Sequence, residues 1–153
     1  MTGGICVSEE ALTEDVASRL IGLSRDWEAE NSCHGYRANT MDDLAGRRIF
    51  LARDGAGEIV GYLFGIVITQ ERETSVIHQG TRKFEVEELY VVPERRCIGV
   101  GRALFYSMEK AVRNDAECIY LDTATKDARR ILHFYLDEVG MEFWSASLVK
   151  HLK

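Results

Sequence analysis

The chain has 153 residues, of which 46% are hydrophobic and 29% charged, and its formal net charge is −6 at pH 7. This size and composition predict one globular domain over residues 1–153, which buries about two-thirds of its unfolded surface. The acidic balance argues against nonspecific nucleic-acid binding. No apolar run approaches the roughly 20 residues that span a bilayer, and the N-terminus lacks a signal pattern. We therefore expect a cytoplasmic protein with no nucleic-acid or membrane partner.

The four cysteines are spaced too irregularly for a zinc ribbon or a thioredoxin motif, because no C-x-x-C pair is present. Cys33 stands next to His34, but two adjacent residues alone make a poor metal site. We expect reduced cysteines and no metal.

The first half of the chain predicts a strand, two helices and a hairpin. Residues 4–12 are typical of a short strand followed by a helix start. Apolar side chains then recur at three- and four-residue steps over 14–30, which predicts a helix. "ANTMDDLAG" predicts a short helix with Thr40 as N-cap, Asp43 three residues on and Gly46 after its end. Two strand-like runs joined by "DGAG" over residues 47–71 predict a hairpin.

The second half predicts strands that alternate with helices. A strand over 81–93 is stopped by Pro93, and an amphipathic helix follows over 99–115. A strand over 117–124, a helix over 126–140 and a final strand over 141–153 complete the chain. Antiparallel hairpins followed by a strand–helix–strand crossover indicate an α/β (α+β) domain with a mixed sheet and helices on its faces.

The run "RRCIGVGR", residues 95–102, joins a strand to a helix with two glycines between arginines. Consecutive amides at a helix N-terminus suit an anion such as a pyrophosphate. A P-loop is excluded because its lysine and hydroxyl are missing, and a dinucleotide fingerprint is excluded because Leu104 occupies its third glycine position. The remaining signature, Arg96-x-x-Gly99-x-Gly101, is equally compatible with an ordinary turn that needs glycine for a positive φ.

A longer stretch resembles motif A of the GNAT superfamily, the acetyl-coenzyme A-dependent N-acetyltransferases. The family pattern E-[DE]-L-x-V-x-P followed by [QR]-x-x-G-x-[GA] is matched over residues 87–93 and 96–101. A downstream "HFYLDEVGMEF" resembles the family's F-Y-x-x-x-G-F. The resemblance covers essentially the whole chain and implies a central, mostly antiparallel twisted sheet flanked by about four helices.

The resemblance also implies where acetyl-CoA, as acetyl donor, would be held. Its pyrophosphate would rest on the glycine turn, and its pantetheine arm would lie along the preceding strand and bond to the backbone. The implied cofactor-binding residues are Leu89, Tyr90, Val91, Arg96, Cys97, Ile98, Gly99, Val100, Gly101 and Arg102. The family's asparagine seven residues before the tyrosine is Ala128 here, so the resemblance implies that this contact is either lost or replaced by Arg129 or Arg130.

Acetyl transfer to an amine requires a base for the ammonium and a proton donor for the departing thiolate. Tyr135 aligns with the family's donor tyrosine. For the base the resemblance favours Glu87, with Glu85 second and Glu88 as a contact to a cationic substrate. Strand alternation places Glu85 and Glu87 on one face and Glu88 on the other, unless a bulge changes the count.

The segment between the first two helices usually lines the acceptor pocket in this family. Here it contains carboxylates beside aromatic side chains, with Asp26, Trp27 and Glu30 as weak candidates for substrate contact. Such a surface suits a polyamine, an aminoglycoside or a lysine side chain, and it also suits a solvated helix face.

We therefore expect an N-acetyltransferase that transfers the acetyl group of acetyl-CoA to a primary amine by direct attack in a ternary complex. The alternatives are a catalytically silent acyl-CoA-binding or sensor module of the same fold, and a nucleotide-binding protein. The hydrophobic final segment "FWSASLV" is compatible with pairing across a homodimer and with a place inside the sheet.

Overall fold

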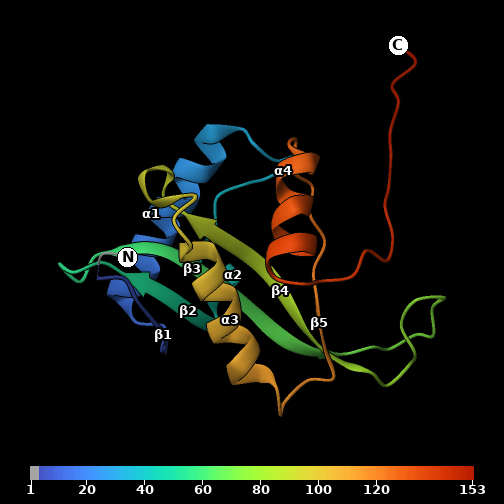
Figure 1. The fold of residues 1–153 in the computed structure, drawn as a ribbon, viewed down its shortest axis with the longest axis horizontal. Helices are drawn as coiled ribbons and strands as arrows, with labels where there is room; N and C mark the ends of the chain where they lie inside the picture. Colours follow the sequence, from blue (N-terminus) through green and yellow to red (C-terminus); the bar gives the residue numbers. More distant parts are fainter. Residues whose placement is uncertain (1–3) are drawn as a thin grey trace.

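The computed structural model describes residues 4–153 and places five strands in one mixed sheet in the order β1-β2-β3-β4-β5 (Figure 1). The antiparallel strands are β1 (Cys6–Glu10), β2 (Arg48–Arg53), β3 (Ile59–Thr69) and β4 (Arg82–Val91). β5 (Cys118–Tyr120) pairs in parallel with β4. The helices are α1 (Glu14–Glu30), α2 (Met41–Leu44), α3 (Val100–Val112) and α4 (Ala128–Leu132). This arrangement confirms the predicted fold class.

The sheet separates two hydrophobic clusters, because alternate side chains of its strands point to opposite faces. On one face α3 packs against the sheet, with Leu104 and Met108 in the same cluster as Phe84. On the other face α1 packs, with Leu20 in the same cluster as Tyr62. No helix within residues 4–153 is long and apolar enough to cross a membrane.

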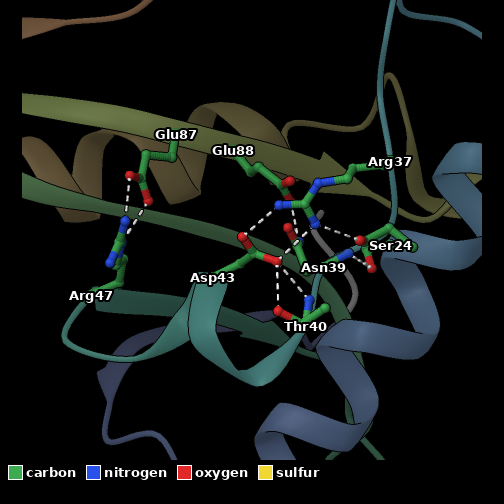
Figure 2. Close-up of polar contacts among 9 residues, drawn as sticks. Ser24, Arg37, Asn39, Thr40, Asp43, Arg47, Glu87 and Glu88 are labelled. Atoms are coloured by element: carbon green, nitrogen blue, oxygen red, sulfur yellow. Dashed lines mark hydrogen bonds and ion pairs between the residues drawn. The ribbon is translucent and has the colours of Figure 1, made fainter.

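Both helices before β2 begin where the sequence predicts. The Thr13 hydroxyl accepts a hydrogen bond from the backbone N–H of Val16 at 3.2 Å, which caps α1. At α2 the backbone N–H of Thr40 donates to the Asp43 carboxylate at 2.7 Å (Figure 2). The predicted capping box is therefore confirmed.

A β-bulge interrupts the pairing of β3 with β4. Gly65 lies opposite Val86, whereas the preceding residue Phe64 lies opposite Glu88. Glu87 is thus the extra residue, and regular alternation ends at this point. The bulge fixes how the neighbouring glutamates of β4 are directed.

The C-terminal third differs from expectation in two ways. The predicted helix over 126–140 is confirmed, but it consists of α4 followed by a π-helix (His133–Glu138), in which the N–H of Val139 bonds to the carbonyl of Phe134. The predicted final strand over 141–153 is wrong. These residues form an extended segment that leaves the body beside α4 (Figure 1). A strand-like pattern becomes a strand only where a sheet edge pairs with it, and within residues 4–153 no strand pairs with this segment.

Candidate active site

β4 and β5 separate after a short paired region and leave a cleft between them. Their ladder joins only Lys83–Glu85 to Cys118–Tyr120, and the following residues of β4, 86–91, line a cleft of about 400 Å³. Opposite them lie residues 121–125, α4 and the π-helix. The edge of β4 therefore presents backbone groups to this cleft without a neighbouring strand, as strand-like recognition of an extended ligand requires.

The loop after α1 crosses to the segment after β5 and bounds the cleft. The N–H of His34 donates to the carbonyl of Ala124 at 2.8 Å, and the N–H of Lys126 donates to the carbonyl of Ser32 at 2.9 Å. Cys33 and Thr125 form an isolated antiparallel bridge between these bonds. These pairings join segments about 90 residues apart in the chain, and no sequence signal predicted them.

Tyr135 lies in the wall of this cleft, on the π-helix. Burial raises the pKa of its phenol to about 12, so the hydroxyl stays protonated at neutral pH. The ring of its neighbour Phe134 lies 5.0 Å from that of Tyr135, between centroids, and 3.5 Å from the position that a Cβ would take at Gly101. The predicted donor is thus held beside the cleft as a neutral O–H group.

Glu88 also lines the cleft and is held by two neutral donors. The Asn39 amide and the Tyr62 hydroxyl each donate to the same carboxylate oxygen at 2.8 Å (Figure 2 shows Asn39). Burial raises the pKa of this carboxyl, and these hydrogen bonds only partly oppose the effect. The buried Tyr36 hydroxyl lies near enough to influence Glu88 but makes no hydrogen bond of ordinary geometry within the described chain.

Glu87 and Glu85 are placed differently from Glu88. Glu87 lines the cleft, but both of its carboxylate oxygens accept from the Arg47 guanidinium, at 2.9 and 3.0 Å (Figure 2). Glu85 lies outside the lining of the cleft, 3.6 Å from the Lys83 ammonium. The bulge is the reason why the spacing of these glutamates did not predict their directions.

The glycine turn has the backbone that the sequence suggested. Cys97 and Gly99 both have positive φ, 62° and 92°, and Gly99 is the N-cap residue of α3. The first N–H groups of a helix have no partner within it, so the amides of Val100, Gly101 and Arg102 are free of helical bonds. Cys97, Ile98 and Gly99 are exposed. The turn adjoins the cleft through Arg96, whereas residues 97–102, which the sequence predicts to bind the cofactor, lie outside the lining of the cleft. Free amides at a helix start suit an anion.

Arg96 is committed to protein contacts. Its Nε donates to the carbonyl of Val91 at 2.8 Å, and its Nη2 lies 2.8 and 3.0 Å from the two carboxylate oxygens of Glu30. The Tyr90 hydroxyl donates to Glu30 as well, at 2.8 Å. Partial burial alone would raise the pKa of Glu30, but the bonds from Arg96 and Tyr90 outweigh it and lower the pKa. This network ties the end of α1 to the glycine turn.

Two of the three weak substrate candidates lie at the cleft. Trp27 and Glu30 line it, and the Trp27 ring lies 4.4 Å from the ring of Tyr36 and 5.3 Å from that of Tyr90, between centroids. Asp26 is exposed on α1 and does not line the cleft. Asp127, the N-cap residue of α4, and Arg130 line it, whereas Ala128, at the family's asparagine position, does not.

Solved structures with the same fold include several acetyltransferases. A ribosomal-protein-alanine N-acetyltransferase from Brucella melitensis is 17% identical, with 97% of this chain and 99% of that chain covered and a TM-score of 0.64. An aminoglycoside acetyltransferase from an uncultured soil metagenomic sample, in complex with sisomicin, is 19% identical, with 97% of each chain covered and a TM-score of 0.65.

A third structure, AAC(6')-Iy in complex with a CoA-containing bisubstrate analog, is 13% identical, with 97% of this chain and 98% of that chain covered and a TM-score of 0.65. No curated protein matches the sequence. The family model for the acetyltransferase (GNAT) family matches residues 7–141, which is most of the chain. The splayed β4 edge, the glycine turn and Tyr135 are therefore parts of an enzyme that belongs to the GNAT family of acetyltransferases.

Proposed function

We propose that this enzyme transfers the acetyl group of acetyl-CoA to a primary amine by direct attack within a ternary complex. The observation that carries the proposal is the unpaired edge of β4, which runs from the glycine turn to a cleft containing both Glu88 and Tyr135. Such an edge can bind the pantetheine amides, while the exposed amides of the turn can bind the diphosphate.

Acetyl-CoA would supply the acetyl group as a thioester. Before attack, a carboxylate takes a proton from the ammonium of the acceptor, so that its nitrogen carries a free electron pair. The nitrogen then forms the new C–N bond as the C–S bond breaks. The Tyr135 hydroxyl would donate its proton to the departing thiolate, for which its neutral form at pH 7 is suited, and the acetylated nitrogen would release its extra proton, through water, to restore the phenol.

We assign the base to Glu88 and keep Glu87 as the competing assignment. The sequence pattern favoured Glu87, but Arg47 occupies both of its oxygens. In Glu88 both protein donors bond to one oxygen, and burial raises the pKa of the carboxyl toward that of a useful base. Glu85 lies outside the cleft and would act only through water.

The acceptor we propose is a cationic amine, such as a polyamine, an aminoglycoside or a lysine side chain. Glu88 and Asp122, which make no arginine contact in the described chain, line the cleft together with the aromatic rings of Trp27 and Tyr90. Glu30 and Glu87 line it too, but each is paired with an arginine. Negative charge beside aromatic faces favours ammonium groups. The aminoglycoside and protein substrates named for the structural relatives are compatible with this class.

The test combines a thermal shift with a thiol-release assay over a panel of amines. Acetyl-CoA at about 100 times its Kd should add roughly 2.7 kcal/mol to the free energy of unfolding. Free thiol should then appear with at least one cationic amine. Binding without thiol release for any amine would support the silent module instead. A larger shift with ATP or NAD than with acetyl-CoA would support a nucleotide-binding protein.

Variants separate the residue roles. Tyr135→Phe and Glu88→Gln should each lower kcat by about 10²- to 10⁴-fold with little change in acetyl-CoA affinity. Tyr106→Phe is the matched control for the tyrosine, because the Tyr106 hydroxyl bonds to the carbonyl of Glu138 outside the cleft. If Glu87→Gln is the more damaging glutamate variant, Glu87 is the base and our assignment to Glu88 is wrong.

A further inference from the structure

Ser24 is a fully buried polar residue on the apolar face of α1. It is 0% exposed, as is Leu20 on the same face. A buried hydroxyl is costly unless it is hydrogen-bonded, and packing alone would be served better by an apolar side chain. The Ser24 hydroxyl donates to the carbonyl of Ile21 at 2.8 Å and accepts from the backbone N–H of Asn39 at 2.9 Å (Figure 2). This serine therefore fixes the backbone of Asn39 against α1.

Asn39 carries the contact from α1 to the cleft. Its side-chain amide donates to one oxygen of Glu88 at 2.8 Å, and the Tyr62 hydroxyl donates to the same oxygen at the same distance. The Tyr62 ring is fully buried and lies 5.9 Å from the ring of Phe64 and 5.8 Å from that of Tyr90, between centroids. Close packing of this kind prevents the ring from turning away. One oxygen of Glu88 is thus held from two sides by side chains that are themselves fixed.

The two groups that hold Glu88 are both neutral. Burial raises the pKa of the Tyr62 phenol well above its ordinary value, so the hydroxyl donates as a neutral group, and the Asn39 amide carries no charge. Glu87, by contrast, is paired with the Arg47 guanidinium. A guanidinium stabilises a carboxylate strongly and makes it a poor acceptor for a proton. Neutral donors fix a carboxylate in place with a smaller loss of basicity.

We propose that Asn39 and Tyr62 are positioning residues for acetyl transfer, which hold Glu88 by one oxygen and leave the other free for the proton of the acceptor. Ser24 acts one contact further out, by fixing Asn39. We call Ser24, Asn39 and Tyr62 the Glu88 cradle. The inference rests on the proposed function, in which Glu88 takes a proton from the ammonium of the acceptor. Within residues 4–153, both side-chain donors to Glu88 reach the same oxygen.

The charged and titratable groups around the cradle act on Glu88 in opposite directions. Burial raises the pKa of Glu88, the two cradle donors lower it, and the negative charge of Asp43 raises it again. Arg37 does not pair with Glu88, because its guanidinium donates to both carboxylate oxygens of Asp43 at 3.0 Å. The Tyr36 hydroxyl stays neutral at pH 7, because burial raises its pKa. Loss of a cradle donor should therefore raise the pH at which Glu88 ionises.

The first test measures the ionisation of Glu88 without any turnover. Carbon-13 NMR of the glutamate carboxyl groups, with the Glu88 signal assigned by its loss in Glu88→Gln, gives the midpoint of its titration. Tyr62→Phe removes the hydroxyl but keeps the ring, so the fold should be retained and the midpoint should move to higher pH. Asn39→Ala should move it in the same direction, and Ser24→Ala should do so by a smaller amount.

The matched controls lie on α3, which packs on the other face of the sheet. Tyr106→Phe and Ser107→Ala remove the same groups there and should leave the midpoint of Glu88 unchanged. An unchanged midpoint in both Tyr62→Phe and Asn39→Ala overturns the inference, whatever the activity of the enzyme. A midpoint that moves equally in the controls overturns it as well.

The second test follows kcat/KM against pH, with an amine that supports thiol release. On the acidic side of the rise, kcat/KM of Tyr62→Phe should be about 10-fold lower than that of the wild type, the equivalent of one hydrogen bond to a charged group. At higher pH, where Glu88 is ionised in both proteins, the two values should approach each other. A loss of kcat/KM that is equal at every pH indicates a merely structural role and contradicts the inference.

The two tests together separate the cradle from the proposed function. A midpoint that shifts in the NMR titration and in kcat/KM alike supports both. A shift in the NMR titration with an unchanged pH profile of kcat/KM shows that Glu88 is not the base. The assignment of Glu88 then fails, and with it the part of the cradle in the reaction.

Discussion

Gly65 in β3 tests the geometry on which the candidate active site depends. A Cβ at this position would lie 2.2 Å from the carbonyl oxygen of Glu85 and 2.9 Å from two ring carbons of Phe84. The first of these atoms belongs to the backbone of β4, so no rotation of a side chain can relieve the overlap. Gly65→Ala must therefore push β3 and β4 apart at the bulge.

The expected cost has two parts. Overpacking of this kind costs about 1–3 kcal/mol, and the loss of one ladder hydrogen bond adds about 1 kcal/mol. A total near 3 kcal/mol is a large share of the roughly 5–15 kcal/mol that stabilises a typical domain. For a chain of this length it corresponds to a fall in Tm of about 6–12 °C.

Urea unfolding and calorimetry measure the effect, with Gly22→Ala in α1 as the matched control. No atom lies within 4 Å of the Cβ that Gly22 would gain, so alanine there should stabilise the helix by up to about 1 kcal/mol. The folded fraction of Gly65→Ala should bind acetyl-CoA but turn over amine slowly, since the bulge directs Glu87 and Glu88. A loss of stability below about 0.5 kcal/mol would refute the close approach of the two strands.

Three further predictions concern the turn, the base and a helix cap. Gly99→Ala should weaken acetyl-CoA binding and cost about 1–2 kcal/mol of stability because φ is 92°. Gly101→Ala should leave the stability unchanged, because its Cβ would meet Phe134 at an ordinary 3.5 Å. Measurements of Kd and Tm for Gly99→Ala, and of Tm for Gly101→Ala, check these outcomes. The kcat/KM of the wild type should rise with pH through a pKa above 4.5, because Glu88 must be ionised to act and burial raises its pKa. In Glu88→Gln this rise of kcat/KM with pH should be absent. Asp43→Asn should cost about 1 kcal/mol at pH 7. Hydrogen bonds from Arg37 and Thr40 lower the pKa of Asp43 below its ordinary value of 3.8. The stabilisation by Asp43 is therefore complete at a pH well above 3.8 and is lost as the pH falls below that value. Urea melts of the wild type and of Asp43→Asn should converge in acid.

Local sequence patterns predicted those structural elements that are determined by neighbouring residues of one segment. The cap at Thr40 and the apolar spacing of α1 and α3 are properties of neighbouring residues, and the structure confirms them. The positive φ of Gly99 is likewise a property of its own turn. The fold class followed from the order of these elements and from the family motif.

Contacts between distant segments could not be predicted from the sequence. Nothing near Arg96 indicates that Glu30, 66 residues earlier, holds its guanidinium. The direction of Glu88 depends on a bulge and on Asn39 from another loop. The prediction of a strand over 141–153 was wrong for a related reason. Alternating apolar and polar residues make a segment able to form a strand, but they do not show whether a sheet edge lies close enough to pair with it.

The π-helix makes the length of its segment as important as its composition. In a helix of 3.6 residues per turn, adding or removing one residue rotates everything beyond it by about 100°. Here one end is held by Phe134 against Gly101, and the other by Val139 in the core, with Tyr135 between them. A single-residue deletion between Tyr135 and Val139 would turn the bond from the N–H of Val139 to the carbonyl of Phe134 into an ordinary α-helical bond and would keep both anchors on one side, whereas an insertion there would rotate Val139 away from the core. Tolerance to deletion and tolerance to insertion should therefore diverge at this helix, with a loss of one residue absorbed where a gain of one residue is not.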